Sequence, residues 1–323
     1  MNLQEILEPI SEELDAFSSY FRGAIRSKVA FVDLIARYIV RQKGKKIRPA
    51  LVLLSAKACG GISDSTYRGA SLVEILHTAT LIHDDVVDDA DTRRGLASIN
   101  AVWKNKVAVL MGDYMLAKGL LLSLDNNDFQ FLKITSDAVR RMSEAEILQI
   151  AKSRDLDLDE ATYLKIISDK TASLLSTCCQ IGAASAAAGP ETVRQLREFG
   201  ENIGMVFQIR DDLLDYTGRK SITGKPTGLD MKEKKLTLPL IYSFLKAPQG
   251  RSKAVLRIIK DGSGKKDLQS VVEFAYEFGG IEYTTRKAEH YSTLALNALE
   301  GLPPSPSKDA LRGFVGFVLE RSK

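Results

Sequence analysis

The fold is decided by one stretch of the sequence, residues 72–90, which reads LVEILHTATLIHDDVVDDA. Residues 72–82 carry apolar side chains at three- and four-residue spacing and on nearly every side, which predicts a helix buried among other helices. The helix then ends in acidic residues, among them Asp84 and Asp88, although the dipole at a helix C-terminus disfavours negative charge. Some other group must therefore stabilise these carboxylates.

The same helical period continues through most of the chain. Strand-like alternation is hard to find, and no linker, repeat or low-complexity tract divides the sequence. Of the 323 residues 45% are hydrophobic and 27% are charged, which is typical of a globular protein. We expect an all-α protein, folded over residues 1–323 as a single large helical bundle around a central apolar cavity.

The composition also excludes several classes of protein. A net charge of +4 is too small over this length to indicate nucleic-acid binding. Three cysteines, Cys59, Cys178 and Cys179, cannot form a disulfide framework, which favours a reducing compartment. The acidic N-terminus does not resemble a signal sequence, and no apolar run approaches the roughly 18 residues of a membrane span. We expect a cytoplasmic protein without a stable membrane anchor.

The first aspartate cluster, Asp84, Asp85 and Asp88, has the spacing of a metal site. Asp84 and Asp88 lie four residues apart, so they share one helical face at a separation of about 5–6 Å. Two carboxylates this close resist joint ionisation unless a cation lies between them. Oxygen ligands favour a hard ion such as Mg²⁺, which usually completes its coordination shell with water and substrate phosphate.

A second cluster repeats the pattern more than a hundred residues later, in FQIRDDLLD at residues 207–215. Asp211 and Asp215 share a helical face, Asp212 lies between them, and Gln208 projects from the same side as Asp215. Either motif alone is a weak signal. Together, two acidic helix ends facing one cavity would hold several Mg²⁺ ions and bind a polyanion such as a diphosphate.

Basic and polar residues that could serve as counter-charges to phosphate flank both clusters. They are Lys45, Arg48, Arg93, Arg94, Lys170 with its neighbour Thr171, Lys225 and Lys235. His77 lies two turns before Asp84 on nearly the same face. Each of these residues alone is more simply a solvated charge, and their significance comes from their position beside the aspartates.

Taken in order, these motifs resemble the trans-isoprenyl diphosphate synthase (polyprenyl synthetase) family, most of all its long-chain heptaprenyl and octaprenyl members. The resemblance runs from about residue 44 to residue 239. The motifs are GKKIRP, LIHDDVVDDADTRRG, GDYMLAKG, DKTASL, GMVFQIRDDLLDYTG and GKPTGLDMKEKKLTLPL. Lys234 and Arg210 depart from the family's pattern, and neither change removes an expected ligand.

The resemblance implies the isoprenoid synthase fold, a homodimer, and the Mg²⁺-dependent, head-to-tail condensation of isopentenyl diphosphate with an allylic prenyl diphosphate. It assigns the diphosphate of isopentenyl diphosphate to Lys45, Arg48, His77 and Arg94. It assigns the allylic diphosphate to Arg93, Lys170, Thr171, Gln208, Lys225 and Lys235. Asp84, Asp88 and Asp211 would be the principal Mg²⁺ ligands, with Asp85, Asp212 and Asp215 nearby or acting through water.

The residues before Asp84 carry a prediction of product length. Short-chain members of the family place a bulky aromatic residue four or five positions before the first aspartate, where this chain has Thr80 and Ala79. In this family such small side chains imply an open channel, and the resemblance to heptaprenyl and octaprenyl members predicts a product of about six to ten units. One helical turn advances about 5.4 Å, close to one isoprene unit, so an error of one turn shifts the product by about one unit. Leu76, Phe129 or Phe131 could form the floor of the channel.

Three alternatives remain open. The enzyme could make a shorter farnesyl or geranylgeranyl product. A terpene cyclase also uses an aspartate-rich site, but the second motif DDLLD and the basic GKKIRP disfavour it. A non-catalytic partner subunit would be expected to lose aspartates from one cluster, and both clusters are intact.

Overall fold

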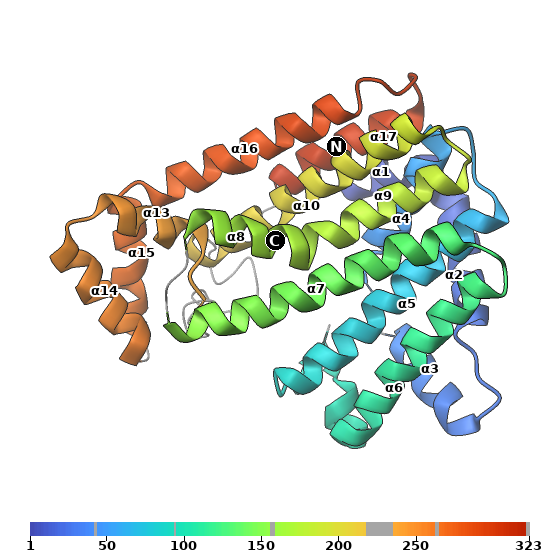
Figure 1. Cartoon of the computed structure of the whole chain (residues 1–323), viewed down its shortest axis with the longest axis horizontal. Helices are drawn as coiled ribbons and strands as arrows, with labels where there is room; N and C mark the ends of the chain where they lie inside the picture. The colour runs from blue at the N-terminus through green and yellow to red at the C-terminus, as the bar shows by residue number, and fades with distance from the viewer. Residues whose placement is uncertain (42–43, 94, 156–158, 218–234, 262–264, 321–323) are drawn as a thin grey trace.

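Helices dominate the part of the chain that the computed structural model describes, residues 1–41, 44–93, 95–155, 159–217, 235–261 and 265–320 (Figure 1). The all-α expectation is therefore confirmed. Three residues named above, Arg94, Lys225 and Lys234, lie outside these ranges.

The elements of the N-terminal half are α1 (Leu3–Leu7), the 3₁₀ turn η1 (Glu8–Ile10), α2 (Ser11–Ala24), α3 (Ala30–Arg41), α4 (Ile47–Ala58), α5 (Asp64–Val87), β1 (Thr92–Arg93), β2 (Leu96–Ala97), α6 (Ile99–Leu124) and α7 (Phe129–Asp155). Those of the C-terminal half are α8 (Glu160–Ile167), the π-helical turn η2 (Ser168–Ala172), α9 (Ser173–Ser185), α10 (Pro190–Thr217), α13 (Leu238–Lys246), α14 (Gln249–Asp261), α15 (Lys265–Glu277), α16 (Gly280–Ala298) and α17 (Pro306–Leu319).

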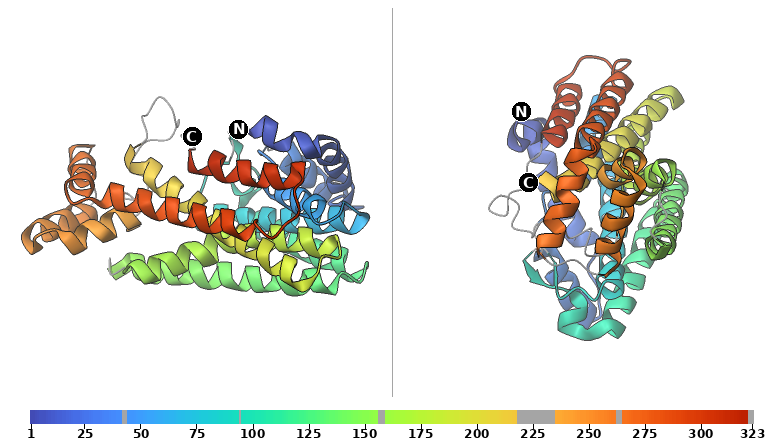
Figure 2. Two further views of the ribbon diagram at one scale, coloured as in Figure 1. Left: turned by 90° about the horizontal axis from the view of Figure 1, so that it is seen from above. Right: turned by 90° about the vertical axis from the view of Figure 1, so that its left-hand side faces the viewer.

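The long helices run alongside one another, and α13, α14 and α15 gather at one end of the elongated molecule (Figures 1 and 2). The largest apolar cluster lies where α4, α5, α9, α10 and α17 meet, and it includes the fully buried Leu53, Leu72 and Phe199. As its all-round apolar surface predicts, α5 is central, since it packs on α4, α6 and α9. This arrangement places the acidic end of α5 beside the helices that carry the basic motifs.

A short antiparallel hairpin follows α5 and is the only sheet in the described residues. Strands β1 and β2 pair Thr92 with Ala97 and Arg93 with Leu96. Asp89 adopts a left-handed backbone (φ 48°) that ends the helix, and the turn between the strands contains Gly95 at φ 79°. The chain therefore folds back so that Arg93 approaches the end of α5.

Helix α6 presents apolar side chains to solvent. Among the described residues it is the single helix that is long and apolar enough to cross a membrane, yet only 33% of its apolar window is buried. The expectation that no segment approaches a membrane span was therefore too strict, because Asp113 and Lys118 interrupt the apolar run without ending it. The exposed apolar side chains are Val102, Val109, Leu110, Leu120, Leu121 and Leu124.

Close contact between α4 and α9 depends on a glycine, and Gly182→Ala tests it. A Cβ at Gly182 would lie 2.3 Å from the backbone oxygen of Val52 and 2.7 Å from the Cβ of Ser55. Because backbone cannot move aside as a side chain can, we expect Gly182→Ala to reduce the free energy of unfolding by about 1–3 kcal/mol. Chemical denaturation measures the change. In the control Gly316→Ala the added Cβ meets nothing within 4 Å, so stability should hold or rise by up to about 1 kcal/mol. Equal effects of the two substitutions would contradict the account.

Candidate active site

The two adjacent aspartates at the end of α5 have different environments. Asp85 is buried and accepts hydrogen bonds from Arg93, through Nε at 2.8 Å and through a second guanidinium nitrogen. Asp84 is half-buried, and Asp88 is the exposed residue that caps the helix. Burial raises the pKa of Asp84, the nearby charges of Glu146 and Asp88 raise it further, and Lys170 and Arg93 oppose them. Asp85 therefore orients Arg93, while Asp84 lies in an acidic setting that favours a cation.

The second cluster, on α10, divides in the same way. Asp212 is buried, with Oδ2 accepting a hydrogen bond of 2.6 Å from Tyr163 and Oδ1 accepting one of 2.8 Å from the amide of Gln208. Asp211 is exposed, and Asp215, one turn further along the same face of α10, is half-buried. Like Asp85, Asp212 is engaged by protein donors, whereas Asp211 and Asp215 are more accessible to solvent.

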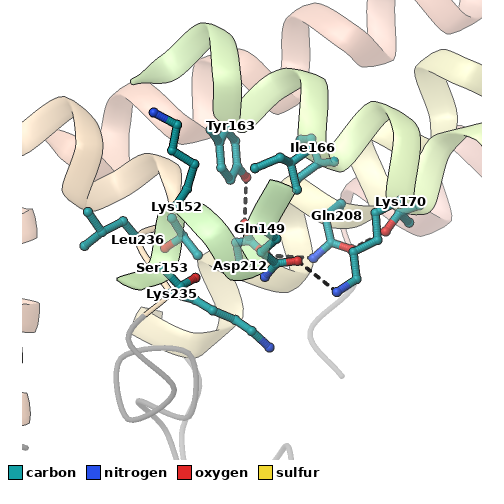
Figure 3. A pocket seen from close by; sticks show the side chains of 13 residues that line it. Gln149, Lys152, Ser153, Tyr163, Ile166, Lys170, Gln208, Asp212, Lys235 and Leu236 are labelled. Atoms are coloured by element: carbon teal, nitrogen blue, oxygen red, sulfur yellow. Dashed lines mark hydrogen bonds between the residues drawn. The ribbon is translucent and has the colours of Figure 1, made fainter. Parts of the chain in front are cut away.

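A cavity of about 120 Å³ lies beside this second cluster (Figure 3). Lys170, Thr171, Gln208, Asp212 and Lys235 all line it, so the structure brings together most of the residues that the resemblance assigns to the allylic diphosphate. Thr171 Oγ1 donates to Gln208 at 2.8 Å, which continues the chain of hydrogen bonds to Asp212. Lys170 lies close enough to influence Asp84 as well, so it links the two aspartate clusters.

Lys170 and Thr171 project from the π-helical turn η2. No sequence pattern indicated a π-helical turn at this position. In this turn the N–H of Ser173 donates to the carbonyl of Ser168, five residues back, where an α-helix would use the fourth. Such turns are rare and occur frequently at functional sites. The Lys170 ammonium lies 2.5 Å from a carboxylate oxygen of Glu146 and 2.8 Å from the amide oxygen of Gln149, both on α7.

A larger cavity, of about 790 Å³, opens on the other side of the α5 end. Lys45, Arg48, Asp85 and Arg93 line it, together with an apolar wall that includes Phe207. Lys45 and Arg48 flank the N-terminus of α4, where the helix dipole already favours negative charge. This concentration of positive charge is suited to an anion such as a diphosphate.

The remaining predicted residues surround a smaller cavity, of about 10 Å³, between α5, α7 and α9. It is lined by Leu76, His77 and Thr80 from α5, so His77 lies here and does not line the large cavity with Lys45 and Arg48. Ala79 is fully buried in the packing of α5 against α6 and does not line this cavity. Its helical position was read correctly, but the neighbour that it faces is set by tertiary packing.

The two phenylalanines proposed as a channel floor differ in their exposure to solvent. Phe131 is buried and packs on α5 beside Gly69, whereas Phe129 is 58% exposed.

Sequence reasoning missed three other residues of the site: Glu146, Gln149 and Tyr163. Glu146 and Gln149 lie three apart on α7, a spacing that signals a shared face, but nothing in the sequence indicates that this face meets Lys170.

Metal ligation fits the residues present, provided that a substrate supplies further ligands. Within the described ranges, no three histidine, cysteine, aspartate or glutamate side chains converge closely enough to hold a metal alone. Asp84 and Asp88 offer oxygen ligands at the acidic end of α5, and Asp211 and Asp215 do so on α10. A cation held by one or two carboxylates and by phosphate oxygens is the usual arrangement for Mg²⁺.

The substitution Asp84→Asn tests the electrostatic cost of this acidic setting. Because the folded-state pKa of Asp84 is raised, the unfolded chain releases this proton first, and stability is lost as pH rises through the folded-state pKa. Asparagine avoids that loss. We therefore expect the melting temperature of metal-free Asp84→Asn to exceed that of the wild type by a margin that opens as pH rises above about 4, the ordinary aspartate value, and is complete once pH has passed the folded-state pKa.

Thermal unfolding followed by circular dichroism across this pH range measures the margin. Asp15→Asn is the matched control, since Asp15 is an exposed aspartate inside α2 and away from the C-terminus of that helix. It should show no growing advantage. An Asp84→Asn variant that loses stability as pH rises, relative to the wild type, would contradict the electrostatic interpretation.

Comparison with known proteins agrees with this geometry. A family model described as polyprenyl synthetase matches residues 29–276. The chain is 37% identical over 319 residues to an all-trans-nonaprenyl-diphosphate synthase (geranyl-diphosphate specific) of Rhodobacter capsulatus, covering 98% of each chain. It is 33% identical over 323 residues to the octaprenyl diphosphate synthase of Escherichia coli (strain K12), covering 100% of each.

A solved structure has nearly the same fold as this chain. The polyprenyl synthase of Caulobacter crescentus CB15, complexed with calcium and isoprenyl diphosphate, superposes with a TM-score of 0.91 at 31% identity, over 100% of this chain and 98% of that one. The fold expected from the resemblance is thereby confirmed. The chain belongs to the polyprenyl synthetase family of metal-dependent trans-prenyltransferases.

Proposed function

We propose that this protein elongates an allylic prenyl diphosphate with isopentenyl diphosphate, head to tail and in the trans configuration, to a long-chain polyprenyl diphosphate. One observation carries the proposal: two cation-lined cavities each include an aspartate at the end of a long helix, Asp85 of α5 in the larger one and Asp212 of α10 in the other. Two separate diphosphate sites are what a condensation of two diphosphate substrates needs. A cyclase, which binds a single diphosphate, has no use for the second.

Isopentenyl diphosphate would bind in the larger cavity. Lys45 and Arg48 provide fixed positive charge at the N-terminus of α4, and Arg93 adds a guanidinium that Asp85 holds in place. The volume is within the usual range for a small-molecule site. Arg94 and His77 stay as predicted contributors: Arg94 lies outside the described residues, and His77 lines the neighbouring small cavity.

The allylic diphosphate would bind beside Lys170, Thr171, Gln208 and Lys235. Without substrate, the ammonium of Lys170 is paired with Glu146 and Gln149. A diphosphate with more negative charge than Glu146 would compete for this lysine. Lys225, outside the described residues, is a further predicted contact.

Mg²⁺ would be held by Asp84, Asp88 and Asp211, with Asp215 nearby or acting through water. When bound, it would neutralise charge on the departing diphosphate and so ease the breaking of the allylic C–O bond. Asp85 and Asp212 would act indirectly, since they hold Arg93 and Gln208.

The side chains themselves would orient the substrates and exclude water. Lys170 and Lys235 stabilise the leaving diphosphate as its charge develops, and Arg93, which lines the larger cavity and not the allylic one, adds positive charge from that side. The double bond of isopentenyl diphosphate then attacks the allylic carbon, and the released diphosphate is a plausible acceptor of the proton that is lost. Thr171 and Gln208 present dipoles to the flank of the cation, and the apolar wall excludes the water that would trap it.

Product length would be set along α5, α7 and α9. Thr80 and Leu76 line the small cavity below Asp84, and no aromatic side chain blocks it at Thr80. Phe131 packs beside Gly69, fifteen residues or about 23 Å before Asp84 along α5, so it would form a floor for the first four or so isoprene units, which a longer product would have to pass. Phe129 is too exposed for this role.

A product assay tests the reaction. Purified protein with Mg²⁺, isopentenyl diphosphate and farnesyl diphosphate should yield a dominant product of about six to ten isoprene units after dephosphorylation, a range that includes the products named for the octaprenyl and nonaprenyl relatives. A fifteen- or twenty-carbon endpoint would contradict the open channel. No elongation with farnesyl, geranyl or dimethylallyl starters would contradict the catalytic assignment and favour a non-catalytic partner subunit.

Substitutions along the cavity test how product length is set. Thr80→Phe should shorten the product, since an aromatic ring would fill the cavity near its top, and Phe131→Ala should lengthen it. Phe129→Ala, a matched change at an exposed position of the same helix, should leave the product unchanged. Chain lengths are compared by chromatography of the dephosphorylated products. Longer products from Phe129→Ala but not from Phe131→Ala would overturn the assignment of the floor.

We propose further that the exposed apolar face of α6 forms a homodimer interface. Six large apolar side chains on one solvent-facing helix favour association with a second copy. Leu110→Lys, at a 59% exposed position, should produce a monomer in analytical ultracentrifugation. Leu245→Lys, at a 71% exposed position of α13, should leave the dimer intact. A wild-type monomer, or a dimer unaffected by Leu110→Lys, would contradict this interface.

A further inference from the structure

A partly buried ion-pair network contacts the turn that presents Lys170 and Thr171. Its centre is Arg141 of α7, whose Nε donates to Asp169 at 2.7 Å and whose Nη2 lies 2.8 Å from Glu201 and 3.0 Å from Ser168. The Arg141 side chain is 18% exposed and that of Asp169 is 10% exposed. Lys165 donates to the second carboxylate oxygen of Asp169 at 2.6 Å. One guanidinium thus joins α7, η2 and α10.

The contacts of this network fall on the first residues of the π-helical turn. Ser168 and Asp169 begin η2, and Ser168 also donates to Glu201 at 2.5 Å. The hydroxyl of Ser173, the residue that follows the turn, donates to the backbone carbonyl of Asp169 at 2.6 Å. This hydrogen bond gives the carbonyl of Asp169 a side-chain partner. Since a π turn is rarely stable by itself, contacts from outside must hold it.

On the opposite side the turn rests against the backbone of α10. A Cβ at Gly204 would lie 2.4 Å from the Cα of Ala172, the last residue of the turn. A Cβ at Gly200 would lie 2.6 Å from the carbonyl oxygen of Leu175, one turn further along α9. The two glycines allow α10 to touch the end of the turn, while Arg141 holds its beginning.

This arrangement determines where Lys170 and Thr171 point. Each residue of an α-helix advances the side-chain direction by about 100°, so relaxation of the π turn to an α-helix would rotate the residues before it against those after it. Lys170 would then lose its place between Glu146 and Gln149, and Thr171 would lose its hydrogen bond to Gln208. Anchoring Ser168 and Asp169 prevents that rotation.

We propose that Arg141 is a positioning residue for the allylic substrate: by anchoring Ser168, Asp169 and Glu201, it maintains the π-helical turn that aims Lys170 and Thr171 at the allylic diphosphate. The inference rests on the function proposed above and deepens it. Arg141 itself does not line the allylic cavity, so its influence on the reaction passes through the turn.

The neighbouring arginine offers a matched control. Arg140 is 58% exposed and forms its ion pairs with Asp137 and Glu144 along the same helix, away from η2. Arg140→Met and Arg141→Met therefore remove the same group from adjacent positions of α7. Arg141→Lys keeps the charge but replaces the planar guanidinium, which contacts its partners through two separate nitrogens, by one compact ammonium, and Glu201→Gln removes one partner charge at nearly constant volume.

Steady-state kinetics with both substrates give the first test. Arg141→Met should lower kcat/KM for the allylic diphosphate by about tenfold to a hundredfold, because a small displacement of binding groups has effects of this size. The KM for isopentenyl diphosphate should stay unchanged, since Lys45 and Arg48 flank the N-terminus of α4 and have no part in η2. Arg141→Lys should restore part of the loss, and Arg140→Met should resemble the wild type. If Arg141→Met fails to fold, Arg141→Lys and Glu201→Gln carry the same test.

Hydrogen exchange gives a readout that does not depend on activity. The amide of Ser173, which closes the π turn, should exchange faster in the Arg141 variants and at the wild-type rate in Arg140→Met. Unchanged exchange and unchanged allylic kinetics in Arg141→Met would overturn the proposal. So would equal losses for both substrates with a lower melting temperature, which would make Arg141 merely structural. If wild type and Arg140→Met both fail to elongate, the proposed function fails, while exchange still decides whether Arg141 holds the turn.

Discussion

The structure depends on the repulsion among carboxylates gathered at the ends of two buried helices. Negative charge there is opposed by the helix dipole, by burial and by neighbouring acids. The protein resolves half of this conflict internally, because Asp85 and Asp212 are buried and hydrogen-bonded to Arg93, Tyr163 and Gln208. The unfavourable charge of Asp84 is not offset in this way, and burial and the nearby charge of Glu146 raise its pKa. A divalent cation with a diphosphate would complete the balance.

The elements around the site position the side chains that hold Asp85 and Asp212 and those that surround Asp84. The β1–β2 hairpin exists where Arg93 must return to Asp85, and α8 brings Tyr163 to Asp212. The π-helical turn η2 places Lys170 between the two clusters, with Thr171 against Gln208. The apolar cluster formed by α4, α5, α9 and α10 supports all of them. Such a rigid frame allows charged groups to be held ready before substrate arrives.

The sequence predicted those features that follow from local periodicity. The all-round apolar character of residues 72–82 indicated a central helix, and the four-residue spacing placed Asp84 and Asp88 together. Periodicity cannot tell which of two adjacent aspartates turns inward, because that depends on Arg93 returning through a hairpin. It also assigned Ala79 to the channel, although packing turns it toward α6. The π turn and the role of Arg141 have no local signal, since both arise from contacts between residues 28 to 60 positions apart.

Calorimetric titration of inorganic diphosphate tests the central claim most directly, because it measures whether the two acidic helix ends and the surrounding cations form one metal-dependent anion site. The account predicts that the wild type binds diphosphate in the presence of Mg²⁺ and only weakly when the metal is chelated, and that Asp211→Asn removes most of the difference. Diphosphate binding of equal strength with and without Mg²⁺ would contradict it, since the lysines and arginines would then suffice alone.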